Sequence, residues 1–362
     1  MDSKDEIYIN GEKSMDKSIQ ILEEKIADKI KNYQKNLRIL EYDEEHVDIW
    51  IKQFPEEERE IILTETDNLL NKNYINQQRI KNIFEDIWQT QEIMTQSPDI
   101  CINKIQFLDI QGKGNSQKTL VKLIEEYYLE TKNTQINKID NCEIEKYIYL
   151  DDCMYTGFTI IKDINNWIKK ENPNYGAELY IVLIGEYNGN YNYVMSHLNE
   201  ICKERAITVK IFRKYEFNNN FHYNDVPYDI LWPQYVNDEY IDKYVEYMEE
   251  EKRATGKGGL GFRNPGYGIA SNLFTSEYNR DIFEKALLKK GAYIWSLANK
   301  RNERIKPMGY NQGISLGFGA FFATDFNISN NCPLAFWWGD MWRSSSETLG
   351  KWYPLLPREV NK

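Results

Sequence analysis

Residues 147–160 read Tyr-Ile-Tyr-Leu-Asp-Asp-Cys-Met-Tyr-Thr-Gly-Phe-Thr-Ile, and this stretch decides the fold. Its first four residues are aromatic or branched apolar side chains, a composition that is typical of a buried strand. Two acids, Asp151 and Asp152, end the run, and a Thr-Gly-Phe-Thr turn follows at residues 156–159. Apolar residues at helical spacing then predict an amphipathic helix over residues 156–169. We therefore predict a strand, an acidic pair, a turn and a helix, in this order.

This order of elements suits a ligand that contains a sugar phosphate. Backbone N–H groups at the start of a helix bind phosphate, and threonine hydroxyls add further donors. Carboxylates at the end of a strand lie beside the crevice where open α/β sheets bind ligands, so they can accept hydrogen bonds from sugar hydroxyls. We expect Asp151 and Asp152 to bind ribose hydroxyls, directly or through Mg²⁺. The expected 5′-phosphate site consists of Tyr155, Thr156, Gly157, Phe158 and Thr159.

A second glycine-rich loop lies upstream, directly after a predicted strand over residues 104–110. Residues 111–119 read Gln-Gly-Lys-Gly-Asn-Ser-Gln-Lys-Thr, and a helix is predicted over residues 117–128. Glycines let the backbone approach a phosphate closely, and the start of the helix offers further N–H donors. We expect this loop to hold a pyrophosphate or a second phosphate through Gly112, Lys113, Gly114, Asn115, Ser116 and Lys118.

Two alternatives apply to these motifs. Residues 112–119 differ by one residue from a Walker A loop, because Gln117 stands where the second glycine belongs, and residues 147–152 would then be the Walker B strand. A glutamine there crowds the backbone around a β-phosphate, and a nucleoside triphosphatase leaves the 156–159 turn unexplained. The plainer alternative is a buried strand that ends in two solvated acids and a threonine at a helix N-cap.

Composition limits the function classes. The 362-residue chain has a formal net charge of −11 and no block of basic residues. Nucleic acid is therefore expected to bind only indirectly or through a local basic patch. No apolar run reaches membrane-spanning length and the first residues show no signal region, so we expect a cytoplasmic protein without membrane contact. Five scattered cysteines and three distant histidines favour free thiols over a zinc site or a Cys–His catalytic pair.

The patterns divide the chain into three expected parts. Residues 1–97 form a charged helical region with apolar stripes. Residues 98–235 alternate predicted strands and helices with short loops, which favours an α/β fold with a doubly wound, mainly parallel sheet. Residues 236–362 are expected to form a C-terminal α/β extension that covers the site as a hood.

The end of this extension is rich in aromatic residues, including the neighbours Trp337 and Trp338. On a strand, adjacent side chains point to opposite faces, so one tryptophan could pack inward while the other contacts a nucleobase or a partner protein. The alternative is that both pack in the core, as aromatic clusters usually do.

The acidic pair and the turn carry a resemblance to a known enzyme class. Four apolar residues, Asp-Asp, three variable residues and Thr-Gly-x-Thr are similar to the phosphoribosyl-pyrophosphate (PRPP) signature of type I phosphoribosyltransferases. This resemblance implies a core of that fold, binding of PRPP with magnesium, and transfer or hydrolysis at ribose C1′. The 111–119 loop then becomes the pyrophosphate loop. The sequence departs from this class at Tyr155 and Phe158, and Phe158 narrows the phosphate pocket unless its ring points away.

Other segments resemble a narrower group, the PRTase-CE effectors of bacterial conflict systems. The similar segments are Trp-Ile-Lys-Gln-Phe at 50–54, Gly-Phe-Gly at 317–319, residues 330–338 and residues 352–358. The resemblance implies a toxin effector of antiviral (anti-phage) defence that works with protein partners such as the sensor modules of retrons or nucleotidyltransferase-type systems. A nucleotide-sensing module without catalysis is an alternative, and so is the nucleoside triphosphatase.

Overall fold

The structure, a computed structural model, divides into two compact units. The sheet unit spans residues 76–222, and the helical unit combines residues 1–75 with residues 223–362. The structure describes residues 3–35, 41–95, 98–112, 114–137, 144–220, 227–256, 258–259, 261–268, 273–297 and 304–358. None of the helices in these ranges is long and apolar enough to cross a lipid bilayer.

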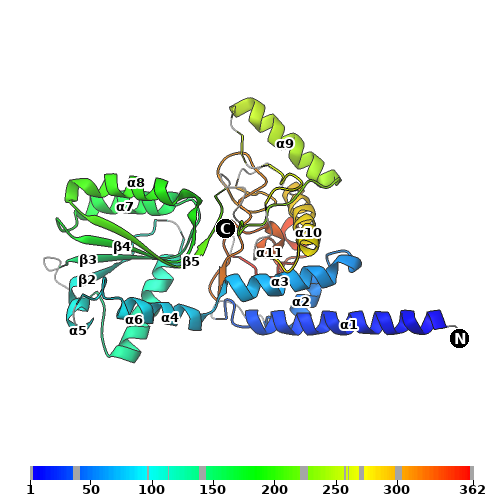
Figure 1. The fold of residues 1–362 in the computed structure, drawn as a ribbon, viewed down its shortest axis with the longest axis horizontal. Helices are drawn as coiled ribbons and strands as arrows, with labels where there is room; N and C mark the ends of the chain where they lie inside the picture. Colours follow the sequence, from blue (N-terminus) through cyan, green and yellow to red (C-terminus); the bar gives the residue numbers. More distant parts are fainter. Residues whose placement is uncertain are drawn as a thin grey trace. The chain divides into compact units, whose positions relative to one another are not determined.

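A four-stranded parallel sheet forms the centre of the sheet unit (Figure 1). Its strands, in spatial order, are β2 (Ile105–Leu108), β3 (Lys146–Met154), β4 (Glu178–Tyr187) and β5 (Thr208–Phe217). The predicted α/β fold with a parallel sheet is confirmed. The two central strands are buried along most of their length, as expected for strands covered on both faces.

Helices cover both faces of this sheet (Figure 1). The apolar sides of α7 (Phe158–Glu171) and α8 (Tyr191–Cys202) pack on one face, where Ile164 and Leu198 share a core with Tyr149. On the other face lie α4 (Gln77–Gln89) and α6 (Ser116–Lys132), and Tyr128 of α6 contacts the rings of Phe107 and Trp88. The short elements are α5 (Pro98–Cys101) and 3₁₀ turns at Ile102–Lys104, Asn188–Asn190 and Lys203–Arg205.

Strand β3 is longer than the four-residue strand that the sequence predicts. Its pairing with β4 continues through Asp151, which lies opposite Leu183, to Met154, which lies opposite Glu186. The acidic pair therefore lies within the strand and not beyond its end. Pairing with a neighbouring strand outweighs the low strand propensity of aspartate here.

The helical unit joins the two ends of the chain, in contrast to the expected separate N-terminal region and C-terminal extension. Trp50 donates its indole N–H to the carbonyl oxygen of Ala335 at 3.0 Å and stacks on Phe336. Phe54 packs edge-on against Trp352, with ring centroids 5.6 Å apart. Aromatic residues from both ends thus share one core, whereas α4, expected in the N-terminal region, belongs to the sheet unit.

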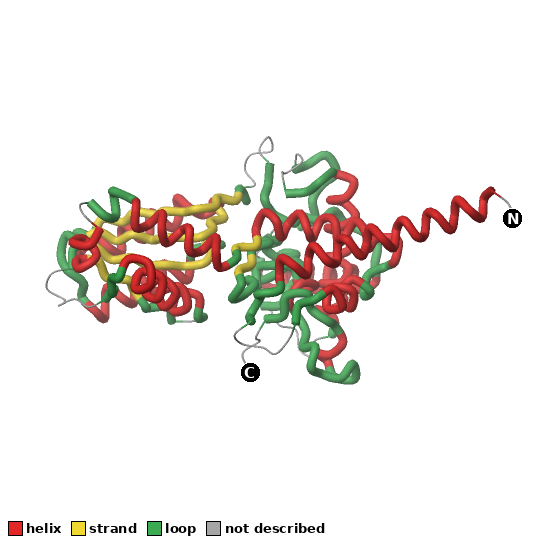
Figure 2. Tube along the Cα trace, turned by 90° about the horizontal axis from the view of Figure 1, so that it is seen from below, coloured by secondary structure: helices red, strands yellow, loops and turns green. Residues whose placement is uncertain are grey.

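This unit is mostly helical and irregular (Figure 2). Its helices are α1 (Ser3–Ile30), α2 (Glu44–Ile51), α3 (Arg59–Asn73), α9 (Glu239–Thr255), α10 (Glu277–Ser296) and α11 (Leu334–Trp337). Two 3₁₀ helices add Glu56–Glu58 and Thr348–Lys351. A two-residue strand β1 (Tyr74–Ile75) pairs in parallel with β6 (Ala323–Thr324). The expected α/β character of the extension is limited to this pair within the described residues.

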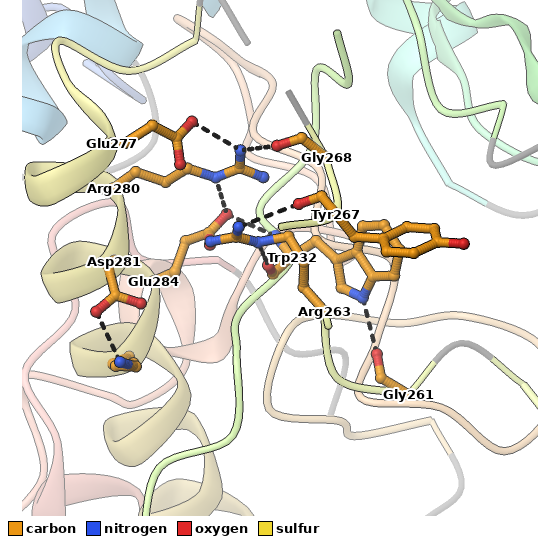
Figure 3. A network of polar contacts seen from close by, with 10 residues as sticks. Trp232, Gly261, Arg263, Tyr267, Gly268, Glu277, Arg280, Asp281 and Glu284 are labelled. Carbon is orange, nitrogen blue, oxygen red and sulfur yellow. Dashed lines mark hydrogen bonds and ion pairs between the residues drawn. The ribbon is translucent and has the colours of Figure 1, made fainter. Parts of the chain in front are cut away.

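A buried ion-pair network holds α10 to the loop before it (Figure 3). Glu284 accepts from the side chains of Arg280 at 3.2 Å and Arg263 at 3.3 Å, and from the backbone N–H of Trp232 at 2.8 Å. Arg263 and Arg280 also donate to the carbonyl oxygens of Tyr267 and Gly268. Since a buried charge is tolerated only when it is paired and hydrogen-bonded, this network has a structural role.

The expectation that Trp337 and Trp338 lie on a strand is wrong. Trp337 is the last residue of the short helix α11, and Trp338 is its C-cap. Their exposed fractions are 7% and 5%, and both belong to the core of the helical unit. Trp337 donates its indole N–H to the carbonyl oxygen of Cys332. This burial favours the packing alternative over contact with a base or a partner protein.

Candidate functional site

The Thr-Gly turn (residues 155–159) joins β3 to α7. Gly157, the N-cap of α7, has a φ of +74°, which residues with a side chain rarely adopt. A Cβ at this position would also overlap the side chain of Val194 on α8. The glycine is thus required by its backbone conformation and by the close approach of α8. The first N–H groups of α7 have no acceptor within the helix, and Thr159 is exposed, so the turn presents donors at the surface.

The two aromatic residues of the turn pack against neighbouring rings. Phe158 is 41% exposed, and its ring centroid lies 5.7 Å from that of Tyr193 on α8. The ring of Tyr155 stacks on Tyr187 at the end of β4, with centroids 5.4 Å apart. Both side chains therefore have packing partners of their own.

The acidic pair, Asp151 and Asp152, is bonded to its own strand and to α6. Asp151 is 6% exposed, and its Oδ1 accepts a 2.8 Å hydrogen bond from the hydroxyl of Ser116. The same oxygen accepts from the backbone N–H of Asp152 at 2.9 Å. Oδ1 of Asp152 accepts from the N–H of Cys153 at 2.7 Å, and this side chain is half-buried.

The surroundings of Asp151 disfavour its charged form. Burial raises the pKa of Asp151 well above its ordinary value, and the charge of Asp152 raises it further. The hydrogen bond from Ser116 acts in the opposite direction. Two adjacent carboxylates of which one is buried are poised to share a proton or to take up a cation or hydroxyl donors.

The glycine loop (residues 111–118) is held in place by two buried side chains. Oε1 of Gln117 accepts from the backbone N–H groups of Ile110 at 2.6 Å and Gln111 at 2.8 Å. The N–H of Gly112 donates to Oδ1 of Asp163 on α7 at 3.2 Å. Gln117 and Asp163 are both buried. The start of the loop is therefore bonded to α6 through Gln117 and to α7 through Asp163.

The structure brings several predicted site residues together. Ser116, the first residue of α6, joins the glycine loop to the acidic pair through its bond to Asp151. The remaining loop residues with described positions, Gly112, Gly114, Asn115 and Lys118, are exposed. Lys113 lies outside the described residues.

The contacts of the glycine loop weaken the Walker A alternative. A Walker A loop wraps phosphates with consecutive backbone N–H groups. Within residues 112–119, the N–H of Gly112 donates to Asp163, and the N–H of Gln117, at the position of the missing glycine, donates to Oε1 of Gln111 at 3.3 Å.

One buried acid near the site was not predicted from the sequence. Glu186, near the end of β4, is fully buried and pairs with Arg213 of β5 at 2.9 Å. Neither carboxylate oxygen has a partner with hydrogen-bond geometry in the described structure. Burial raises the pKa of Glu186 to about 7, against the opposing effect of Arg213. The signal in the sequence was a charged residue inside the otherwise uncharged run of residues 179–187.

The acidic pair is also the expected magnesium site. Mg²⁺ prefers oxygen ligands and is usually held by one or two carboxylates together with phosphate oxygens of the substrate. Within the described residues, no group of three or more His, Cys, Asp or Glu side chains is placed to hold a metal ion by itself. Binding of a magnesium ion by Asp151 and Asp152 together with a phosphorylated substrate stays a prediction.

Comparison with known proteins identifies one match. The family model PRTase-CE matches residues 47–358, a range that contains the acidic pair, the Thr-Gly turn, the glycine loop and the aromatic tail. No curated protein and no solved structure matches the chain significantly.

Proposed function

Because the chain belongs to the PRTase-CE family, we propose that it is a phosphoribosyltransferase-like enzyme that binds PRPP, or a related ribosyl phosphate or nucleotide, and acts at ribose C1′. The observation that carries this proposal is the arrangement on consecutive elements of the sheet unit. The glycine loop is bonded to the acidic pair through Ser116, and the Thr-Gly turn follows the same strand.

Each part of the site has a role in this proposal. The Thr-Gly turn binds the 5′-phosphate with the N–H groups of α7 and the hydroxyls of Thr156 and Thr159. The glycine loop, with Lys113 and Lys118, binds the pyrophosphate. Asp151 and Asp152 bind the ribose hydroxyls and hold Mg²⁺, which when bound supplies positive charge to the pyrophosphate oxygens.

The reaction is a substitution at C1′. The bond from C1′ to the pyrophosphate oxygen breaks, and the pyrophosphate leaves with the electron pair. A nitrogen of the acceptor base, or the oxygen of water, forms the new bond to C1′ and releases a proton. The sugar carbon becomes positively charged in the transition state, so the nearby carboxylates stabilise it more than they stabilise the substrate.

Incubation of the purified protein with PRPP, magnesium and a panel of bases and nucleotides tests the proposal, with products identified by mass spectrometry. We expect release of pyrophosphate together with a ribosylated product or ribose 5-phosphate. A double Asp151→Asn, Asp152→Asn variant keeps the shape of the site and should lose this activity. Binding without turnover would favour a nucleotide-sensing module, and steady ATP hydrolysis would favour the nucleoside triphosphatase.

The biological role that we propose is that of a toxin effector in bacterial antiviral defence, acting in the cytoplasm with protein partners. Its support is the resemblance of residues 50–54, 317–319, 330–338 and 352–358 to such effectors. Phage plaque assays on cells that express the chain with the proteins encoded beside it test this role. Protection should disappear in the double Asp-to-Asn variant, and equal protection by both forms would contradict an enzymatic effector.

A further inference from the structure

We propose that Asp163 is a positioning residue that fixes the glycine loop relative to the Thr-Gly turn. The chain then prefers a ribosyl ligand with phosphate groups at both ends over one with a single phosphate. This inference rests on the proposed function, because it concerns the ligand of the same site.

The position of Asp163 is unusual for a carboxylate. It lies on α7, four residues after Thr159, between the core residues Ile160 and Ile164. It is 3% exposed, and burial raises its pKa above the ordinary value. An unpaired carboxylate at such a place is costly, so its hydrogen bonds account for its presence.

Asp163 has two such bonds, one to each neighbouring element of the site. Its Oδ1 accepts from the N–H of Gly112 in the glycine loop at 3.2 Å. Its Oδ2 accepts from the hydroxyl of Tyr149 on β3, also at 3.2 Å, and Tyr149 is fully buried. The side chain thus connects α7, β3 and the glycine loop at one point.

The remaining N–H groups at the start of the loop are also occupied. Gln117 accepts from the N–H groups of Ile110 and Gln111. Together with the bond from Gly112 to Asp163, this leaves none of these three N–H groups for a ligand. The donors available to an anion belong to the later part of the loop, which includes the exposed Gly114 with its φ of +97°. Asp163 and Gln117 therefore decide which part of the loop faces a ligand.

A single rigid helix then sets the separation of the two phosphate sites. The Thr-Gly turn is the start of α7, and the side chain of Asp163 one helical turn later holds the glycine loop. A ligand with a 5-phosphate and a 1-diphosphate carries one group for each site, whereas ribose 5-phosphate carries a group for the turn alone. The ligand with phosphates at both ends should bind more tightly, because the protein holds the donors for both of its phosphate groups in place before it binds.

Calorimetric binding of PRPP and ribose 5-phosphate to three variants tests the proposal. In Asp163→Ala the loop loses its anchor, so PRPP affinity should fall by about tenfold while ribose 5-phosphate affinity stays within about twofold. Asp163→Asn keeps an oxygen that accepts from Gly112 and should bind both ligands like the wild type. The exposed neighbour Lys162 provides the control Lys162→Ala. Equal loss of both ligands in Asp163→Ala, or no loss, would overturn the positioning role.

Hydrogen–deuterium exchange of a peptide covering residues 108–118 gives a readout that needs no ligand. Exchange should be faster in Asp163→Ala but unchanged in Asp163→Asn and Lys162→Ala. Unchanged exchange in Asp163→Ala overturns the inference even if PRPP binds. Wild-type protein that binds neither ligand overturns the proposed function, and the specificity assigned to Asp163 with it.

Discussion

The hydroxyl of Ser116 donates a 2.8 Å hydrogen bond to Oδ1 of Asp151, which joins the first residue of α6 to the acidic pair on β3. The two residues are 35 positions apart in the sequence. The bond stabilises the charged form of a buried carboxylate, because it opposes the rise in pKa that burial causes.

Replacement of Ser116 by alanine should therefore raise the pKa of Asp151 further and weaken PRPP binding near neutral pH. A hydrogen bond to a charged group contributes about 1.5–3 kcal/mol, so we expect the dissociation constant to rise by about tenfold or more. Ser116→Thr keeps the hydroxyl and is the matched control. Calorimetry that finds the same affinity in Ser116→Ala and Ser116→Thr would show that the bond is incidental to binding.

Gly157→Ala should destabilise the sheet unit as well as the Thr-Gly turn. The left-handed conformation costs about 1 kcal/mol for a residue with a Cβ, and overlap with Val194 adds about 1–3 kcal/mol. Gly176 provides the control, since its φ is +77° but a Cβ at that position would have no atom within 4 Å. In denaturant unfolding, Gly176→Ala should lower the free energy of unfolding only by the cost of the left-handed conformation. A second change, Val194→Ala, should partly restore the stability of Gly157→Ala, and the absence of any such gain would contradict the overlap.

Glu186 should make the stability of the chain depend on pH in a defined direction. Its folded-state pKa of about 7 lies above the ordinary 4.5, so the folded state holds the proton more tightly than the unfolded state. Its stabilising contribution is complete below about pH 4.5 and is lost as the pH rises to about 7. Relative to Glu186→Gln, the wild-type free energy of unfolding should fall by up to about 3 kcal/mol over this range.

Urea unfolding of both proteins across this pH range measures the difference. The exposed Glu200 offers a control, because Glu200→Gln should leave the slope of the wild type unchanged. Parallel curves for wild type and Glu186→Gln would show that the carboxylate does not titrate in this window.

Loss of the Glu284 carboxylate should destabilise the helical unit strongly. Glu284→Ala leaves Arg263 and Arg280 buried without their shared partner, and breaking a buried pair costs about 3–5 kcal/mol. Glu277, whose side chain is 50% exposed and lies 3.3 Å from Nη1 of Arg280, is the matched position. Glu277→Ala should cost less than about 1 kcal/mol. Similar midpoints for the two variants in guanidinium unfolding would contradict the structural role of the network.

The sequence by itself determined the core of the sheet unit and the order of the motifs along it. Apolar runs and amphipathic segments predicted strands and helices close to β2, α6, β3 and α7, because the two-residue period of a strand and the 3.6-residue period of a helix depend only on local geometry. The Thr-Gly turn was recognisable for the same reason, since the left-handed conformation of Gly157 belongs to the local backbone.

Tertiary structure decided which distant groups meet. The bonds of Asp163 to Gly112 and of Ser116 to Asp151 depend on helix placement on the sheet, which no local pattern encodes. The two tryptophans illustrate the same limit, because alternation predicts opposite faces only if Trp337 and Trp338 lie on a strand, and a short helix formed there instead. Burial of Glu186 likewise follows from its neighbours on β3 and β5. Local periodicity specifies an element and its apolar side, whereas the contacts between elements depend on how the whole core packs.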